Sequence, residues 1–203
     1  MIGLLYAESL KGAAVEIEHA DGTRRPLDSA RWLRPAPGDE AILSQCLAPV
    51  LDIGCGPGRF TVELARRAVP TLGIDITPYA VHLTRRAGGL VLCCDVFGPV
   101  VGSGHWATVL LADGNIGIGG DPHALLRRVR ELVRPGGQIL TEVEPPGVVS
   151  RVDRLRLRGL GLTGDWFTWA RVSVTDFPSM ARSAGFTEVD SWQADDRWFA
   201  RLH

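Results

Sequence analysis

The stretch of residues 50 to 61, which reads VLDIGCGPGRFT, constrains the fold more than any other part of this chain. Its apolar start predicts a short buried strand, and a helical pattern begins at Arg59. Between them, glycine recurs at every second position, at Gly54, Gly56 and Gly58. Glycine tolerates positive φ and lets a ligand approach the backbone, and the free N–H groups of a helix start favour polar or anionic ligand groups. The stretch therefore predicts a strand, a tight turn and a helix that bind a nucleotide-type ligand.

From residue 47 onward, apolar strand patterns alternate with amphipathic helix patterns. Such alternation predicts a doubly wound α/β fold, with a mostly parallel sheet and helices on both faces. Thr77-Pro78 and Asp121-Pro122 each place a helix-capping residue before a proline, which is typical of a helix start. After the first strand and the helix of residues 59–68, the pattern predicts a second strand ending at Asp75, a helix from residue 78 to Gly88-Gly89, strands at 90–94 and 107–112, a helix from residue 122 and a strand at 138–144.

The string DIGCGPG resembles the first motif of the class I S-adenosylmethionine-dependent methyltransferases, and the chain is similar to the small bacterial members of that family. The resemblance covers residues 47 to 144 well, because VRPGGQILTEVE also resembles the family's helix, turn and fifth strand. It implies a Rossmann-like sheet of seven strands whose last strand is antiparallel. It also implies S-adenosylmethionine as the cofactor and S-adenosylhomocysteine as its product.

The same resemblance implies which residues bind the cofactor. The glycine loop would wrap the methionine portion, Asp75 in TLGIDIT would bind the ribose hydroxyls, and Asp95 in LVLCCDVF would bind the adenine amino group. The full set of expected cofactor-binding residues is Asp52, Gly54, Cys55, Gly56, Gly58, Asp75, Ile76, Asp95, Val96 and Asp113. The GxGxG spacing differs from the GxGxxG of nicotinamide and flavin binders, which disfavours an oxidoreductase.

The string ADGNIGIGGDP, residues 112 to 122, follows the fourth strand, where methyltransferases place the loop beside the transferred methyl group. Ligands of open α/β sheets bind at the carboxyl ends of the strands, so Asp113 and Asn115 are candidate catalytic residues. Equally, both side chains could only fix the turns of the loop through hydrogen bonds to the backbone. His123, in the first turn of the next helix, is a candidate general base, although a histidine there is more often a surface or packing residue.

Residues 1–46 are expected to form a cover segment over the mouth of the site or simply over a sheet edge. Residues 15–19 and 23–27 flank the turn signal Asp21-Gly22 and predict a small hairpin. Residues 38–47 predict a helix with Asp39 as its N-cap.

Residues 146–175 predict a second hairpin, inserted after the fifth strand. Arginine alternates with apolar residues over 151–158, and residues 166–174 are rich in β-favouring types. Residues 176–203 then predict a helix ending at Gly185 and two antiparallel strands, 187–193 and 197–202, which resemble the family's terminal hairpin with the seventh strand between the fifth and sixth. Glu142 and Glu144 share one face of the fifth strand, and Glu144 either reaches the substrate or pairs with an arginine of the insertion.

Composition narrows the class of protein. With 203 residues and 45% hydrophobic content, one domain covering residues 1–203 is expected. The chain has no apolar run of eighteen residues and no secretory signal pattern, so a cytoplasmic protein without a membrane partner is expected. The four cysteines lack CxxC spacing, so no metal site is expected. A net charge of −1 without a long basic run argues against a nucleic acid partner.

The function expected from these features is methyl transfer from S-adenosylmethionine to a small-molecule substrate by in-line displacement. An alternative is a binding or regulatory module that holds the cofactor without turnover. We expect the acceptor between the 113–120 loop and the inserted hairpin, with the segment around Trp32 as its cover. Phe167, Trp169 and Arg171 share one strand face and would suit an aromatic or carboxylate-bearing acceptor, unless these rings only pack the hairpin onto the sheet.

Overall fold

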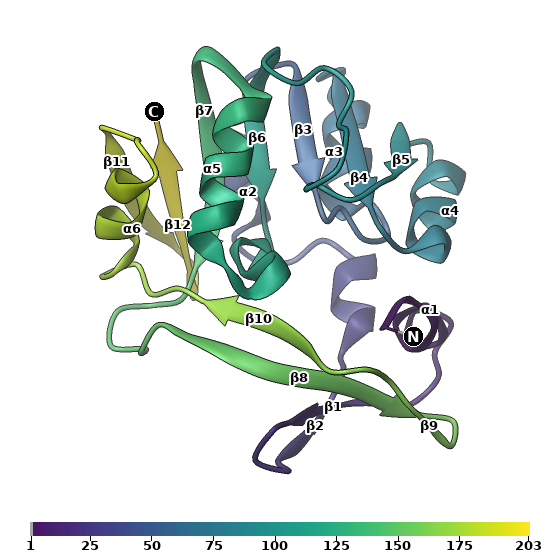
Figure 1. The fold of residues 1–203 in the computed structure, drawn as a ribbon. Coiled ribbons are helices and arrows are strands. Elements are labelled where there is room, and N and C mark those ends of the chain that lie inside the picture. Colours follow the sequence, from purple (N-terminus) through teal and green to yellow (C-terminus); the bar gives the residue numbers. More distant parts are fainter. Residues whose placement is uncertain (1) are drawn as a thin grey trace.

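The computed structural model describes residues 2–203, and its centre is a mostly parallel sheet of seven strands (Figure 1). The strand order is β11-β12-β7-β6-β3-β4-β5, in which only β12 runs antiparallel to its neighbours. These strands are β3 (Val50–Ile53), β4 (Thr71–Asp75), β5 (Val91–Cys93), β6 (Trp106–Leu111), β7 (Val133–Val143), β11 (Val189–Ala194) and β12 (Arg197–Leu202). The doubly wound α/β fold expected from the sequence is confirmed, with the seventh strand between the fifth and sixth.

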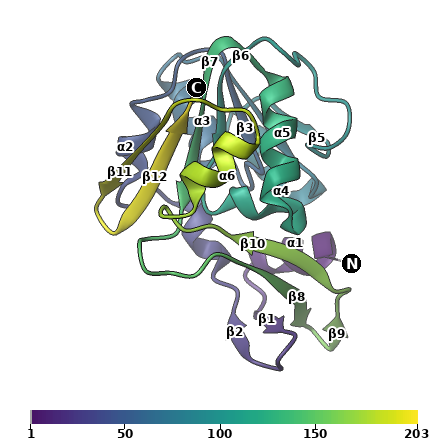
Figure 2. The ribbon, with the colours of Figure 1, turned by 60° about the vertical axis from the view of Figure 1, so that its left-hand side comes forward.

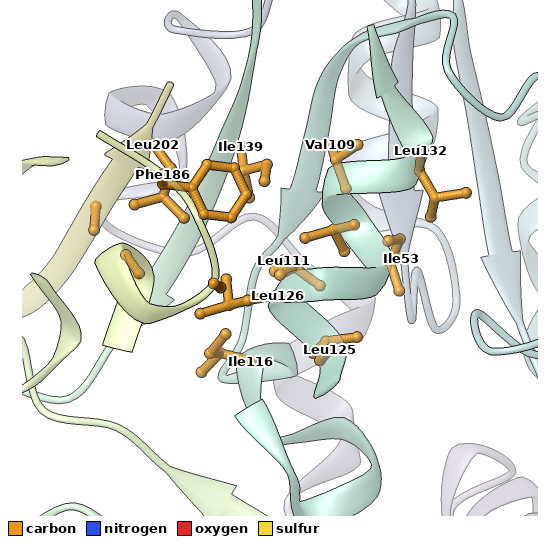
Figure 3. Packing of buried hydrophobic residues seen from close by; sticks show 14 of the residues in the cluster. Ile53, Val109, Leu111, Ile116, Leu125, Leu126, Leu132, Ile139, Phe186 and Leu202 are labelled. Atoms are coloured by element: carbon orange, nitrogen blue, oxygen red, sulfur yellow. The ribbon is translucent and has the colours of Figure 1, made fainter. Parts of the chain in front are cut away.

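Helices cover both faces of this sheet, as Figures 1 and 2 show from two sides. Helices α5 (Pro122–Leu132) and α6 (Phe177–Ser183) pack on one face, where Leu125 and Leu126 meet Ile53 and Leu111 in the larger apolar cluster (Figure 3). On the other face lie α2 (Asp39–Leu43) and α3 (Arg59–Arg66), and their apolar side chains pack against β3, β6, β7 and β12. Helix α4 (Pro78–Arg86) flanks β4 and β5. The central strands are continuously apolar because both faces are buried.

A second sheet joins the two hairpins that the sequence predicts separately. Its order is β10-β8-β1-β2, with the short β9 beside β8. Its strands are β1 (Val15–His19), β2 (Arg24–Pro26), β8 (Arg151–Gly159), β9 (Leu162–Thr163) and β10 (Phe167–Arg171). The N-terminal hairpin pairs with the insertion through β1 and β8, for example Ile17 with Leu157. Figure 1 shows this sheet lying across the end of the main sheet at which β3 and β4 finish.

The second sheet is fixed to that end by backbone hydrogen bonds. Glu144, just past β7, donates its N–H to the carbonyl of Val172 and accepts from the N–H of Val174 at 2.8 Å each. The 3-10 helix η2 (Asn115–Gly120), which follows β6, packs against β10. Gly117 lies so close to Trp169 and Ala170 that an added Cβ would overlap them. The insertion is therefore held directly over the carboxyl ends of β6 and β7.

Several expected element bounds are corrected. Helix α1 (Ile2–Leu10) was not expected, and it packs on the second sheet through the buried Leu5. Asp39 is not the N-cap of α2. The N-cap is Gly38, in the left-handed conformation, and α2 ends at Leu43 rather than at residue 47. The segment expected as a loop before β10 contains β9, and β7 starts at Val133, five residues before the expected start. Tertiary pairing overrides local propensity at these places.

We expect Phe199→Ala to destabilise the fold by about 3–5 kcal/mol, because the fully buried ring of β12 would leave a cavity against the helices α2 and α3. Urea denaturation measures this change. The control is Val149→Ala, at a side chain that is 73% exposed, which should change the free energy of unfolding by less than about 0.5 kcal/mol. Equal effects of the two substitutions would contradict the placement of Phe199 in the core.

Candidate active site

The turn between β3 and α3 depends on its glycines. Gly54, Gly56 and Gly58 all have positive φ, of 67°, 54° and 91°. A Cβ on Gly58 would lie 2.7 Å from the Thr84 side chain, whose hydroxyl donates to the carbonyl of Gly56 at 2.9 Å. A side chain at any of the three positions would therefore strain the backbone, and one at Gly58 would also collide with α4. The expected tight turn is present at the carboxyl end of β3.

Asp75 connects the end of β4 to this turn. Its carboxylate accepts from the N–H of Gly56 at 2.9 Å and from the N–H of Thr77 at 2.7 Å, and burial raises its pKa. The next residue, Ile76, is 63% exposed. Asp75 thus stands beside the glycine turn, with an exposed apolar side chain next to it, and the binding of the ribose by Asp75 stays a prediction.

Asp52 and Cys55 lie deeper in the protein. The Asp52 carboxylate is buried and accepts from the Thr61 hydroxyl at 2.6 Å, and burial raises its pKa to about 7. The Cys55 side chain packs with Val81 and Val91, and burial raises the pKa of its thiol. Cys55 therefore faces the core, and only its backbone is available to a ligand in the turn.

Asp95 and Val96 follow β5. Asp95 is exposed, and its carboxylate accepts from the N–H of Phe97 at 3.0 Å. The side chain of Val96 is buried in the core, and the ring of Phe97 is 44% exposed. The binding of the adenine amino group by Asp95 stays a prediction.

Asn115 fastens the loop after β6 to the glycine turn. Its side-chain nitrogen donates to the carbonyls of Ile53, at 2.8 Å, and Gly54, at 3.0 Å. These bonds reach the glycine turn and not the turns of its own loop, and a catalytic role of Asn115 stays a prediction. Asn115 aligns the two loops that meet at the carboxyl ends of β3 and β6.

Asp113 belongs to a buried ion network. Its carboxylate pairs with Arg59 and lies 3.6 Å from Arg197, and its N–H donates to Glu142 at 2.7 Å. Arg59 also donates to Asp39 at 2.6 Å, and Arg197 donates to Asp39 at 2.6 Å and to Glu142 at 2.7 Å. Burial raises the pKa of Asp113, and Arg59 opposes that shift. Asp113, at the cofactor end of the loop, is therefore held in place by two arginines from distant parts of the chain.

The structure separates His123 from the other candidate catalytic residues. Its ring nitrogen Nδ1 lies 3.0 Å from the hydroxyl of Ser183 on α6. It does not line the cavity beside Asp113, so the geometry gives it no proton to remove there. A role as general base stays a prediction.

Tyr6 is a site residue that the sequence analysis missed. From α1 it brings its hydroxyl over the turn, 3.1 Å from where a Cβ of Gly56 would be. Its ring meets the edge of Trp32, with 5.7 Å between the ring centroids. Burial and the nearby Asp75 raise the pKa of its hydroxyl. The apolar run at the start of the chain does not predict this contact, because Tyr6 reaches the glycine turn only when α1 packs onto the second sheet.

A cavity of about 290 Å³ lies between the carboxyl ends of β6 and β7 and the second sheet. Asp113 and Gly114 form one side and Trp169 and Arg171 form the opposite side. The lining residues are Arg25, Arg31, Asp113, Gly114, Ile116, Glu142, Val143, Glu144, Pro145, Leu155, Trp169, Ala170, Arg171, Val172, Asp196, Arg197 and Trp198. Trp32, expected as a cover, contacts Tyr6 instead of lining the cavity.

The described residues, 2–203, contain neither a candidate metal site nor a candidate membrane-spanning helix. No group of three or more histidine, cysteine, aspartate or glutamate side chains in that range is arranged to hold a metal ion. No helix in the same range has the length and apolar character needed to cross a membrane.

Comparison with known proteins agrees with this geometry. Residues 50–137, from β3 into β7, match a family described as "Methyltransferase domain". No curated protein matches the chain significantly. The matched residues include the glycine turn, Asp75 and the loop of Asp113, which are the parts of the site that lie on the main sheet.

Solved structures share the fold. A S-adenosylmethionine-dependent methyltransferase from Bacteroides fragilis, in complex with S-adenosyl-L-homocysteine, has a TM-score of 0.83 at 20% identity, covering 100% of this chain and 93% of that chain. The CcbJ methyltransferase from Streptomyces caelestis has a TM-score of 0.61 at 16% identity, covering 84% and 90%. The 1,6-didemethyltoxoflavin-N1-methyltransferase from Burkholderia thailandensis has a TM-score of 0.57 at 20% identity, covering 75% and 69%.

The fold and the site define a Rossmann-like, cofactor-binding α/β protein. The family match shows that residues 50–137 are similar to a methyltransferase domain. The residues of the site fit the cofactor, because the glycines of the turn carry no side chains of their own, the Tyr6 hydroxyl is the polar group above Gly56, and Asp75 and the exposed Ile76 flank the turn.

We expect Asp75→Ala to weaken the binding of S-adenosylhomocysteine about ten- to hundredfold, because the ribose loses a charged acceptor and the turn loses its contact at Gly56. Isothermal titration calorimetry measures the dissociation constant. Asp121→Ala, which removes the N-cap of α5, is the matched control and should leave it unchanged. An unaltered dissociation constant in Asp75→Ala would show that the ribose binds elsewhere.

The raised pKa of Asp52 predicts a pH dependence of stability. The unfolded carboxyl titrates near pH 4, but the folded one titrates at about 7, so the folded state keeps a proton that the unfolded state releases. The free energy of unfolding should therefore fall between about pH 4 and 7 through this group. Asp52→Asn should gain stability relative to wild type across that range, in urea denaturation at several pH values. The exposed Asp190→Asn is the control, and parallel curves for Asp52→Asn and wild type would refute this assignment.

Proposed function

We propose that this methyltransferase transfers the methyl group to a small molecule bound in the cavity between Asp113 and Trp169. The observation that carries the proposal is the position of that cavity, which opens from the loop after β6, beside the glycine turn. Ligands of open α/β sheets bind at this end of the strands. The cavity of about 290 Å³ is at the lower end of the range typical of small-molecule sites.

The character of structurally similar enzymes supports a small acceptor. The Burkholderia protein is described with 1,6-didemethyltoxoflavin bound, and the protein MtfA, at a TM-score of 0.58 and 14% identity, is a glycopeptide N-methyltransferase. These names describe those proteins. In this chain, the narrow cavity under the second sheet also favours a small acceptor, because a nucleic acid duplex or the surface of a folded protein would not enter it.

When bound, S-adenosylmethionine supplies a sulfonium-activated methyl group. The chain's own residues then have to align the acceptor and exclude water. Asn115 and the Arg59–Asp113 pair fix the cofactor side, and Trp169 closes the opposite side. Of the carboxylates in the cavity, Glu142 is saturated by Arg197 and the N–H of Asp113, whereas Glu144 has only a 3.9 Å contact with Arg171. Glu144 is therefore the better proton acceptor where the acceptor atom must lose a proton.

Incubation of the protein with S-adenosylmethionine carrying a deuterated methyl group and a bacterial small-molecule extract tests this function. Mass spectrometry should find labelled products that require the protein and are lost in Asp75→Ala. Tight binding of S-adenosylhomocysteine without any labelled product would instead support a cofactor-binding module.

Two substitutions test the two sides of the site. Asn115→Ala should weaken the binding of S-adenosylhomocysteine about tenfold, because it removes the hydrogen bonds that align the loops. Arg171→Ala should leave that binding unchanged and raise the Michaelis constant of the acceptor. Both proteins should remain folded by circular dichroism. Wild-type cofactor binding and turnover in both would show that the site is misplaced.

A further inference from the structure

Three arginines from separate elements meet at the wall of the cavity formed by the second sheet. Arg25 belongs to β2, Arg171 ends β10, and Arg31 lies on the 3-10 helix η1 (Ser29–Leu33) that follows β2. All three line the cavity. They are separated by up to 146 positions in the sequence, so their meeting is a product of the fold.

Strand register explains why Arg25 and Arg171 face the cavity. Arg25 is paired with Ile17, whose side chain is buried beneath the second sheet. The neighbouring Arg24 is paired with Glu18 and makes its ion pair with that residue on the other face. Arg171 is two residues beyond Trp169, so both share the face that lines the cavity.

This arginine cluster has fewer acidic partners than its charge requires. Arg171 lies 3.3 Å from Asp153 and 3.9 Å from Glu144. Within the part of the chain that the structure describes, Arg25 and Arg31 form no hydrogen bond and no ion pair, although Arg31 stacks over Trp32. Burial and the charges of Arg171 and Arg31 lower the pKa of Arg25. The three positive charges therefore repel one another, and the contacts of Asp153 and Glu144 are both with Arg171.

The other acidic side chains of the cavity have different partners. Arg59 and Arg197 are matched by Glu142, Asp39 and Asp113 at the inner end. Asp196, the remaining lining carboxylate, is next to Arg197 on the turn between β11 and β12. Among the described residues, Arg25 and Arg31 therefore line the cavity without an acidic partner, together with the ring of Trp169.

We propose that Arg25, Arg31 and Arg171 bind a carboxylate of the methyl acceptor, so that the enzyme's substrates are small carboxylic acids with an apolar or aromatic body. This inference rests on the proposed function, because it assigns the substrate class of the same cavity. Guanidinium groups bind carboxylates with paired, charge-assisted hydrogen bonds. The four carboxylates that also line the cavity, Asp113, Glu142, Glu144 and Asp196, would repel a phosphate, which carries nearly two negative charges, more strongly than a carboxylate, which carries one. Trp169 provides the surface for the body of the acid.

The test measures binding, without turnover, in protein saturated with S-adenosylhomocysteine. The probes are benzoate and 4-hydroxybenzoate, each with its primary amide as the neutral match, together with phenyl phosphate. Ligand-observed NMR gives their affinities for wild type, Arg25→Ala, Arg31→Ala and Arg24→Ala. Arg24 is the matched control, because it is on the same strand as Arg25 but pairs with Glu18. Circular dichroism and the affinity for S-adenosylhomocysteine report whether each variant is folded.

We expect each acid to bind more tightly than its amide, and Arg25→Ala or Arg31→Ala to weaken the acids about tenfold with no effect on the amides. Arg24→Ala should behave as wild type. The proposal is overturned if no acid binds, if amides bind as well as acids, if phenyl phosphate binds better than benzoate, or if acid binding survives both substitutions. Acid binding without any methyl transfer would refute the proposed function alone, and transfer to neutral acceptors without acid binding would refute this inference alone.

Discussion

The buried ion network around Arg59 is the interaction on which the site depends. The Arg59 side chain is 7% exposed and joins Asp39, the first residue of α2, to Asp113 after β6, while Arg197 from the last strand joins Asp39 and Asp113 to Glu142. Charges buried to this degree persist only when they are paired and hydrogen-bonded. The network therefore fixes the N-terminal segment, the helix after the glycine turn, the loop after β6 and the terminal hairpin relative to one another.

The second sheet gives this core its own specificity. The main sheet provides the floor for the cofactor, but it leaves the carboxyl ends of β6 and β7 open. Residues from the N-terminal hairpin and the insertion close that end together, because β1 pairs with β8. As a result, Arg25 and Trp169, which are remote in sequence, line the same cavity. The proposed acceptor site is thus built partly from segments outside the main sheet.

How much the sequence predicts depends on the range of the contacts involved. The glycine turn and Asp75 at a strand end follow from local patterns, whereas the strand order is implied by the family resemblance, and the structure shows each of them. The two hairpins were also predicted, but their union into one sheet was not, because strand partners are chosen by packing and not by strand pattern. The sequence does not indicate that Arg59 and Arg197 are buried, because a single arginine in a sequence looks the same whether it is exposed or part of a buried ion pair. In the same way, the sequence around Asp39 predicts a helix cap and gives no indication of its ion pairs with Arg59 and Arg197.

The central claim is that the cofactor occupies the glycine turn with its reactive sulfur toward the cavity of Asp113 and Trp169. A crystal structure of the protein with S-adenosylhomocysteine tests it most directly. The account predicts the ribose hydroxyls at Asp75, the adenine beside Ile76 and the sulfur facing the cavity under the second sheet. A ligand bound elsewhere, or a sulfur that faces packed protein away from that cavity, would contradict it.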